Sequence, residues 1–293
     1  MPVSAEDRWS IQLDCLTRTD IVRFAGAGGD FNPNHHDEPH ARANGYPGVF
    51  AMGLFTASFA SRLIDERFPD TMVRSFAVRF RAMVWPGEAL IAHAVRVPGE
   101  AHRVEIEVVN AGGEVKLSGT ADIGPRAISE SPAAPPPPPP PVPSPGGALN
   151  DRVGEVVRAF VFPIEIGKVM EFSRAMTARD VPANYAALGD QPIRVPLTFS
   201  VAAAHYAGGD ATALPIALGL DLARTVHGEQ RWDYYGPLRA GTVISGRTAI
   251  AAVERKVGRA GEMLLVTTRT DFRDEHGVLL QSESMTSVEM PAR

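Results

Sequence analysis

Residues 52–64 read Met-Gly-Leu-Phe-Thr-Ala-Ser-Phe-Ala-Ser-Arg-Leu-Ile, and this stretch decides the fold. It is apolar nearly all round and rich in small residues, and Arg62 carries its only charge. A helix of this kind is buried on most of its sides. The remainder of the chain must therefore wrap around it.

Strand-like segments follow this helix directly. Val104, Ile106 and Val108 alternate with Glu105 and Glu107, which is typical of a strand with one buried face. The residues 110–113, Asn-Ala-Gly-Gly, are a hairpin signal. The predicted strands are 73–84, 89–97, 104–109 and 115–123. The order is one buried helix, then antiparallel strands.

Composition excludes several classes of protein. The 293 residues are 44% hydrophobic, with a net charge of -5 and a pI near 5.9, so no basic excess exists to bind nucleic acid. No apolar run approaches the roughly 18 residues of a spanning helix, so we expect no membrane insertion. Cys15 is the only cysteine, and residues 1–9 lack the pattern of a signal peptide. We expect a cytoplasmic protein.

A proline run at 135–141, flanked by Ala, Ser and Gly, predicts a stiff polyproline linker. A PxxP ligand for an SH3-type partner is the alternative. The predicted units are 1–127, a catalytic domain, 128–152, the proline-rich linker, and 153–293, a degenerate non-catalytic domain.

The second unit repeats the element order of the first. Apolar helices are predicted at 167–176 and 197–206, and residues 80–87 match 234–241 in their aromatic, aliphatic and glycine positions. The strands are expected near 229–235, 243–254, 263–272 and 278–288. A diverged repeat of a helix enclosed by an antiparallel sheet predicts an α+β double hot-dog, a pseudo-dimer within one chain.

The candidate chemistry lies upstream of the first helix. Residues 19–25 predict a short helix that breaks at glycines, and Pro33 stiffens the loop that follows. Asp30 and His35 can then face one spot. A carboxylate beside an imidazole can move a proton and a water molecule near neutral pH. A polar turn closed by an Asx hydrogen bond is the alternative.

This segment resembles the signature of the MaoC-like (R)-specific hydratase and dehydratase family, Gly-Asp-x-Asn-Pro-x-His-x-Asp. Residues 29–37 read Gly-Asp-Phe-Asn-Pro-Asn-His-His-Asp, with Gly53 at the start of the following helix. The similarity spans roughly residues 9–123. Two departures are Asn34, where an aliphatic residue is usual, and Met52, where a histidine often precedes the helix glycine.

The second unit is similar to the non-catalytic hot-dog of such enzymes, and in particular to one subunit of the mycobacterial (3R)-hydroxyacyl-ACP dehydratases. The resemblance rests on residues 196–199 and 227–230, with Tyr234 and Pro237. No histidine stands at the equivalent of His35. We therefore expect one active site per chain, with the second unit shaping an acyl tunnel and needed for activity on long chains.

The resemblance implies a (3R)-hydroxyacyl thioester dehydratase, or in reverse a trans-2-enoyl thioester hydratase, of fatty-acyl metabolism. Its partner would be an acyl-ACP or acyl-CoA presented on a phosphopantetheine arm. Asp30 and His35 would be catalytic and would work from one face, which predicts syn geometry. The backbone N–H of Gly53 would bind the thioester oxygen.

Three further roles follow with their alternatives. Tight helix packing would equally explain Gly53. Asn32 is expected to bond backbone within the loop and to orient Asp30. The hydroxyl of Ser61 would contact the catalytic loop or bond back to the carbonyl four residues earlier.

No cofactor is expected. His35, His36, His40 and Asp37 invite a zinc interpretation, but adjacent histidines diverge and no cysteine joins them. The other histidines, 93, 102, 205, 227 and 276, are expected to be packed or exposed. A homodimer of double hot-dogs stays open, because a fused pair already mimics a dimer.

Two other classes of function remain as alternatives. A hot-dog thioesterase typically places a carboxylate on or near the central helix, and residues 52–64 contain none. A non-catalytic acyl-binding or scaffolding protein would use Asp30 and His35 only as turn residues.

Overall fold

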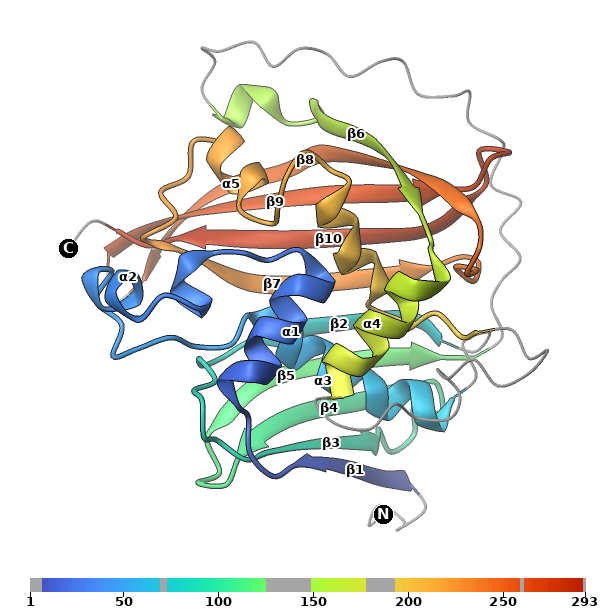
Figure 1. Cartoon of the computed structure of the whole chain (residues 1–293). Coiled ribbons are helices and arrows are strands. Elements are labelled where there is room, and N and C mark those ends of the chain that lie inside the picture. Colours follow the sequence, from blue (N-terminus) through green and yellow to red (C-terminus); the bar gives the residue numbers. More distant parts are fainter. Residues whose placement is uncertain (1–6, 69–72, 125–148, 178–192, 259–260, 292–293) are drawn as a thin grey trace.

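A computed structural model describes residues 7–68, 73–124, 149–177, 193–258 and 261–291. The first half begins with one strand, continues through helices and ends with four strands (Figure 1). Its elements are β1 (Arg8–Leu13), α1 (Arg18–Gly28), the 3-10 helix η2 (Pro33–His35), α2 (Glu38–Ala43), α3 (Gly53–Arg67), β2 (Val73–Phe80), β3 (Leu90–Arg96), β4 (Arg103–Asn110) and β5 (Val115–Ile123).

The second half repeats this order, with a short 3-10 helix where the first half has the long helix α3. Its elements are η4 (Leu149–Arg152), β6 (Val156–Pro163), α4 (Ile166–Thr177), the 3-10 helix η6 (Phe199–His205), α5 (Ala213–Ala217), β7 (Thr225–Tyr234), β8 (Val243–Gly258), β9 (Gly261–Arg273) and β10 (Leu279–Glu289).

All strands join one antiparallel sheet whose order is β1-β3-β4-β5-β2-β7-β10-β9-β8-β6. The sheet is symmetric about its centre. Counting inward from one edge gives β1, β3, β4, β5 and β2, and counting inward from the other gives their counterparts in the second half, β6, β8, β9, β10 and β7. The halves meet where β2 pairs with β7, and there Phe76 lies opposite Trp232 with the rings stacked 5.5 Å apart. The predicted double hot-dog is confirmed.

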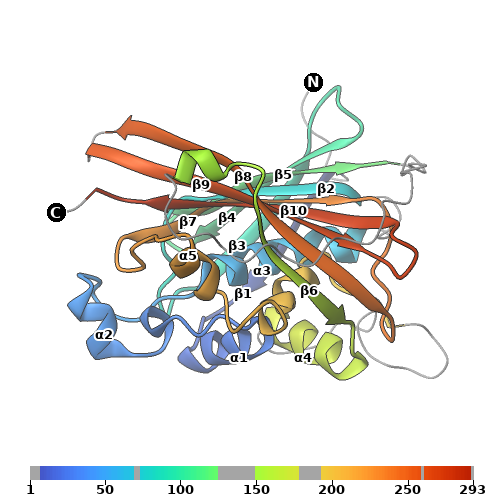
Figure 2. The ribbon, with the colours of Figure 1, turned by 90° about the horizontal axis from the view of Figure 1, so that it is seen from above.

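The helices cover one face of this sheet (Figure 2). α3 is the central helix of the first half, and its side chains from Phe55 to Ser61 are all buried. α1 packs against α4, with Phe24 and Phe172 in ring contact at 5.5 Å. The cores of the halves therefore merge into one.

A buried ion pair also joins the halves. Arg194 donates to the carboxylate of Asp65 at 3.2 Å and to the carbonyl oxygens of Asp65 and Phe68, at the end of α3. The backbone amide of Leu197 donates to the same carboxylate at 3.3 Å. The segment that leads into η6 is thus fixed to α3.

The helix predicted at 197–206 is wrong in type. The chain forms a 3-10 helix over Phe199–His205, and it ends before Gly208 and Gly209, both at positive φ. The hydroxyls near its start bond across to other elements, Thr198 to Ser58 and Ser200 to Glu283. These bonds hold the segment to α3 and the sheet rather than extending the helix.

The strands predicted in both halves are present, with ends that differ by a few residues, and β1 and β6 are additional edge strands. The proline run 135–141 lies outside the described residues, and the domain boundaries remain predictions. Within the described ranges, no helix combines the length and apolar character that crossing a membrane requires.

Candidate active site

The loop that carries Asp30 begins where α1 ends. Thr17 and Asp20 form a reciprocal capping box at the start of this helix, which fixes where it begins. At its end Gly29 adopts φ 75°, a left-handed conformation that favours glycine, and its amide donates to Ala25. The chain turns sharply there, so Asp30 leaves the helix axis at once.

A second short helix places His35. Pro33 begins η2, and the side chain of Asn32 accepts from the amide of Asn34 at 3.1 Å. The amide of Asn32 donates to Asp30 Oδ1 at 3.3 Å. The backbone of Asn32, rather than its side chain, therefore orients Asp30, while its side chain closes the turn before His35.

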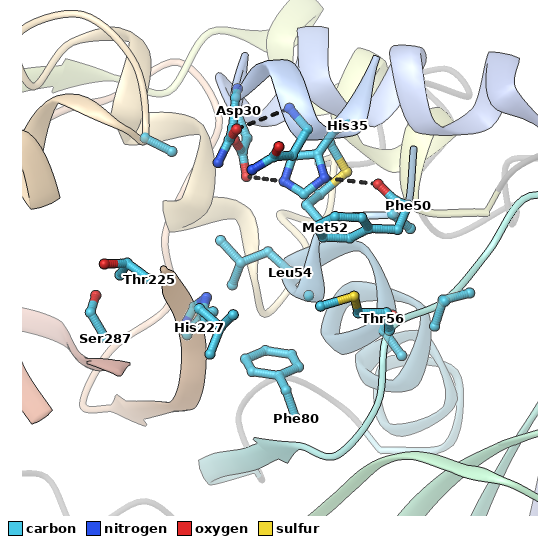
Figure 3. A pocket seen from close by; sticks show the side chains of 18 of the residues that line it. Asp30, His35, Phe50, Met52, Leu54, Thr56, Phe80, Thr225, His227 and Ser287 are labelled. Carbon is cyan, nitrogen blue, oxygen red and sulfur yellow. Dashed lines mark hydrogen bonds and ion pairs between the residues drawn. The ribbon is translucent and has the colours of Figure 1, made fainter. Parts of the chain in front are cut away.

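Asp30 and His35 converge. His35 Nε2 lies 3.8 Å from Asp30 Oδ2, and both side chains are largely buried (Figure 3). This separation is too long for a direct hydrogen bond. It leaves room for one oxygen atom at about 2.8 Å from each group. The pair predicted from the motif is thus placed around a single position.

The other ring nitrogen determines the tautomer. His35 Nδ1 lies 2.8 Å from the carbonyl oxygen of Phe50. A carbonyl can only accept, so Nδ1 carries a proton, and in the neutral ring Nε2 presents its lone pair toward Asp30. The Phe50 ring also packs edge-on against the imidazole, with centroids 5.0 Å apart. His35 is therefore held with its basic nitrogen facing the cavity.

The pair lies on the wall of a cavity of about 300 Å³, a size within the range of small-molecule sites. The first half contributes the pair, Phe50 and Phe80, and the second half contributes residues such as Thr225 and Ser287 (Figure 3). The site therefore belongs to both halves of the chain.

Gly53 lines the same cavity at the first position of α3. The preceding Met52 makes no side-chain capping bond. The first amides of a helix have no acceptor within the helix, so they attract an oxygen carrying negative charge. A Cβ at Gly53 would lie 3.0 Å from the Phe80 ring, so close packing also explains the glycine.

Ser61 lies away from the site. It is fully buried and does not line the cavity that holds Asp30 and His35. Its hydroxyl donates to the carbonyl oxygen of Ser58 at 2.9 Å, three residues earlier. Of the two roles considered for Ser61, a bond to the backbone of its own helix is the one observed, to the carbonyl three residues earlier rather than four.

The two departures from the family signature are accommodated in the structure. Asn34 is buried, and its side-chain oxygen accepts from Asn44 Nδ2 at 2.9 Å, which ties the loop to the end of α2. Met52 is also buried and lines the cavity next to Gly53.

His227, expected from the sequence only to be packed or exposed, lines the cavity. It lies on β7, its ring packs on Phe80 with centroids 4.6 Å apart, and its Nε2 lies 3.0 Å from Gln230 Oε1. Burial lowers the pKa of His227 to about 4. The ring is therefore neutral near pH 7 and forms an uncharged wall facing the pair.

The central helix does carry carboxylates beyond the predicted 52–64, because α3 continues to Arg67 through Asp65 and Glu66. Asp65 is bound to Arg194, and Glu66 is paired with Arg62. Neither lines the cavity. These carboxylates serve the helix end rather than thioester chemistry.

Comparison with known proteins places this geometry in a family. Residues 4–117 match the family model "MaoC like domain", and residues 151–282 match "FAS1-like, dehydratase domain region". A UPF0336 protein of Streptomyces griseus is 35% identical over 122 residues, covering 40% of this chain and 78% of that protein. The chain belongs to the MaoC-like dehydratase family. Its relatives therefore include hydro-lyases as well as proteins without a described activity.

More distant relatives match this MaoC-like protein in part or in fold. The 3-hydroxyacyl-thioester dehydratase X of Mycobacterium tuberculosis is 42% identical over 65 residues, 22% of each chain. A putative MaoC domain dehydratase from Chloroflexus aurantiacus superposes with a TM-score of 0.65 at 16% identity, covering 97% of this chain and 95% of that one. A Mycobacterium tuberculosis protein described as a double hot-dog gives 0.63 at 14% identity, covering 96% of both. These structures share the fold.

Proposed function

We propose that this MaoC-like protein interconverts (3R)-hydroxyacyl and trans-2-enoyl thioesters carried on ACP or CoA, by syn removal or addition of water. The observation that carries the proposal is the 3.8 Å separation of His35 Nε2 and Asp30 Oδ2, on the wall of a cavity that also contains the start of α3. Family membership supports the reaction class.

In the hydration direction, one water molecule lies between His35 and Asp30 and hydrogen-bonds to both. Its oxygen attacks C3 of the enoyl thioester, and one of its protons passes to the pair. The electrons of the double bond move toward the thioester carbonyl. A proton from the pair then reaches C2, so the pair returns to its original charge and the product contains one added water.

The thioester oxygen gains negative charge during this step. The first amides of α3, beginning at Gly53, would stabilise it as preorganised donors. Because water and proton both come from the same two side chains, hydroxyl and hydrogen add to one face of the double bond. The dehydration follows the same path in reverse.

The decisive experiment follows the absorbance of the conjugated enoyl thioester with wild type, Asp30→Asn and His35→Ala. Crotonyl, octenoyl and longer chains should each be offered on both carriers. Removing an acid–base group should lower turnover by roughly 100- to 10,000-fold. The neighbouring variants Asp37→Asn and His36→Ala are matched controls, because Asp37 caps α2 and His36 bonds the Phe31 carbonyl oxygen. They should keep most of the activity.

Equal behaviour of wild type and both site variants, with binding of the thioester, would identify a non-catalytic acyl-binding protein instead. Release of free thiol without formation of a 3-hydroxyacyl thioester would identify a thioesterase. Either result would overturn the proposal.

A further inference from the structure

A line of polar side chains crosses the inner face of the sheet in the second half. Arg158 on β6 lies opposite Thr248 on β8, Thr248 lies opposite Thr270 on β9, and Thr270 lies opposite Glu283 on β10. We call these four residues the polar row. All four line a second cavity of about 100 Å³.

In the first half the equivalent line is apolar on the two strands next to the junction, β5 and β4, and then reaches Arg96 on β3. At the junction Trp232 lies opposite both Phe76 and Glu283. On the other side Phe76 lies opposite Ala121, and Ala121 lies opposite Val104. Ala121 and Val104, both fully buried, thus stand where the second half has Glu283 and Thr270. One copy of the repeat uses these positions as core, so the fold does not require polar residues there.

The space beneath the polar row results from the short helix of the second half. α3 has 15 residues and spans about 22 Å at 1.5 Å per residue. η6 has seven residues and spans about 14 Å at 2.0 Å per residue. The shorter helix covers less of the sheet, and the second cavity lies between the polar row and residues of η6 such as Ser200 and Ala203.

The second cavity adjoins the candidate active site. Asp30, Leu54, Ala211 and Met285 line both cavities. An acyl chain that extends from the pair into the second half would therefore pass these residues and end at the polar row. This arrangement does not suit a long hydrocarbon tail, in contrast to the long-chain tunnel expected from the sequence.

Arg158 supplies the charge in this cavity. Its guanidinium is half-buried, and within the described part of the chain no carboxylate forms an ion pair with it. Asp210 acts on it only as a charge at longer range, and the Asp210 carboxylate is bonded to Thr212. Burial lowers the pKa of Arg158, but a guanidinium stays protonated.

Glu283 does not neutralise Arg158. Three strand spacings separate the two backbones, about 14 Å at the usual spacing. The Glu283 carboxyl group accepts from Ser200 Oγ at 2.8 Å instead. The lining of the cavity therefore contains one cation, Arg158, and two carboxyl groups, Glu283 and Asp30. Its other polar groups are the hydroxyls of Ser200 and three threonines and the amide of Gln230.

We propose that the acyl group processed at Asp30 and His35 is short and ends in a carboxylate that binds Arg158, so that the substrate is the mono-thioester of a dicarboxylic acid. This inference rests on the proposed function. A dry cavity of 150 Å³ accommodates benzene, so about 100 Å³ admits roughly four non-hydrogen atoms at the end of the acyl chain. A bidentate guanidinium–carboxylate pair would fix the chain end.

The test compares two thioesters of the same shape, trans-2-hexenedioyl and 6-methylhept-2-enoyl, which end in a carboxylate and an isopropyl group. The readout is the ratio of their kcat/KM values. The wild type should favour the dicarboxylic substrate by at least about tenfold, as expected for a charge-assisted hydrogen bond. Arg158→Gln should remove this preference, and Arg158→Lys should restore part of it.

Arg247→Gln is the matched control, because Arg247 is the neighbour of Thr248 on β8 and points to the opposite face of the sheet. It should leave the ratio unchanged. Equal use of both thioesters by the wild type, or a ratio unaffected by Arg158→Gln, would overturn the inference. Crotonyl thioester is too short to reach the polar row. If it is turned over while the dicarboxylic preference is absent, the proposed reaction stands and only the inference about Arg158 fails.

Discussion

His205 Nε2 lies 2.9 Å from the carbonyl oxygen of Gly26. This contact connects the end of η6 in the second half to the last turn of α1 in the first. The amide of Ala211 donates to the carbonyl oxygen of Gly29 at 2.9 Å, one residue before Asp30. The second half therefore supports the loop that carries Asp30 and His35.

His205→Ala should lower kcat while leaving KM nearly unchanged, because the loop loses a support but the cavity keeps its lining. The lost hydrogen bond should also lower the free energy of unfolding by about 1–3 kcal/mol. Steady-state kinetics and denaturant unfolding measure the two effects. His205→Gln can still donate to the carbonyl and should recover much of kcat; equal kcat for all three proteins would refute the supporting role.

Gly29→Ala should destabilise the fold more than an unhindered glycine replacement. At Gly29 φ is 75°, and an added Cβ would lie 3.2 Å from Ala204 and His205. Gly99→Ala is the matched control, since its φ is 83° with no atom within 4 Å. Conformational strain should lower the free energy of unfolding of both variants by roughly 1–2 kcal/mol. Gly29→Ala should lose further stability, and also activity, because its Cβ meets neighbouring atoms. Identical unfolding midpoints would contradict this.

His227 should make the fold sensitive to acid. Its pKa is about 4 in the folded protein and about 6.5 when exposed, so the unfolded chain binds the proton first. This contribution is complete above pH 6.5 and is lost as the pH falls through 4, by up to about 3 kcal/mol. The free energies of unfolding of wild type and His227→Asn should be measured across pH 4–7. Their difference should decrease as the pH falls. The exposed His276→Asn should show no such decrease.

Glu283 should act in the opposite direction. Burial raises its pKa to about 7 from 4.5, so its contribution is complete below pH 4.5 and is lost as the pH rises through 7. Glu283→Gln should therefore gain stability relative to wild type across this range. The pH ranges over which His227 and Glu283 change the free energy of unfolding overlap, and the two changes have opposite signs. A variant that lacks one of these groups should therefore show the pH dependence that the other contributes. A difference that does not change with pH would mean that Glu283 titrates normally.

Removal of the whole second half is a poor test of its role. A chain ending near Gly124 would leave β2 without β7 and would expose the buried faces of α1 and α3. Loss of activity would then report loss of the fold. Point variants at His205 and Arg158 separate support of the loop from binding of the acyl chain.

Local patterns predicted much of the architecture. The buried helix α3, the strands β2 to β5 and the loop between α1 and His35 all carry their signals within a few residues. The match of residues 80–87 to 234–241 is also real in space, because Phe80 and Tyr234 end equivalent strands and Gly87 and Gly241 both have positive φ.

Non-local features escaped prediction. Trp9, Ile11 and Leu13 alternate in β1, but the partner strand β3 lies some eighty residues away, and β6 has no alternation of burial. The polar row is spread over four strands, where a threonine such as Thr270 is an ordinary strand residue. The four side chains come together only through the pairing and register of their strands, which the sequence of one strand does not specify.

The most direct test of the central claim is the stereochemistry of water addition. Hydration of crotonyl thioester in D₂O should place deuterium at C2 and the hydroxyl at C3 on the same face, with the (3R) configuration, as NMR of the product would show. Both groups come from one water held between Asp30 and His35, 3.8 Å apart. Addition to opposite faces, or a mixture of diastereomers, would contradict the account.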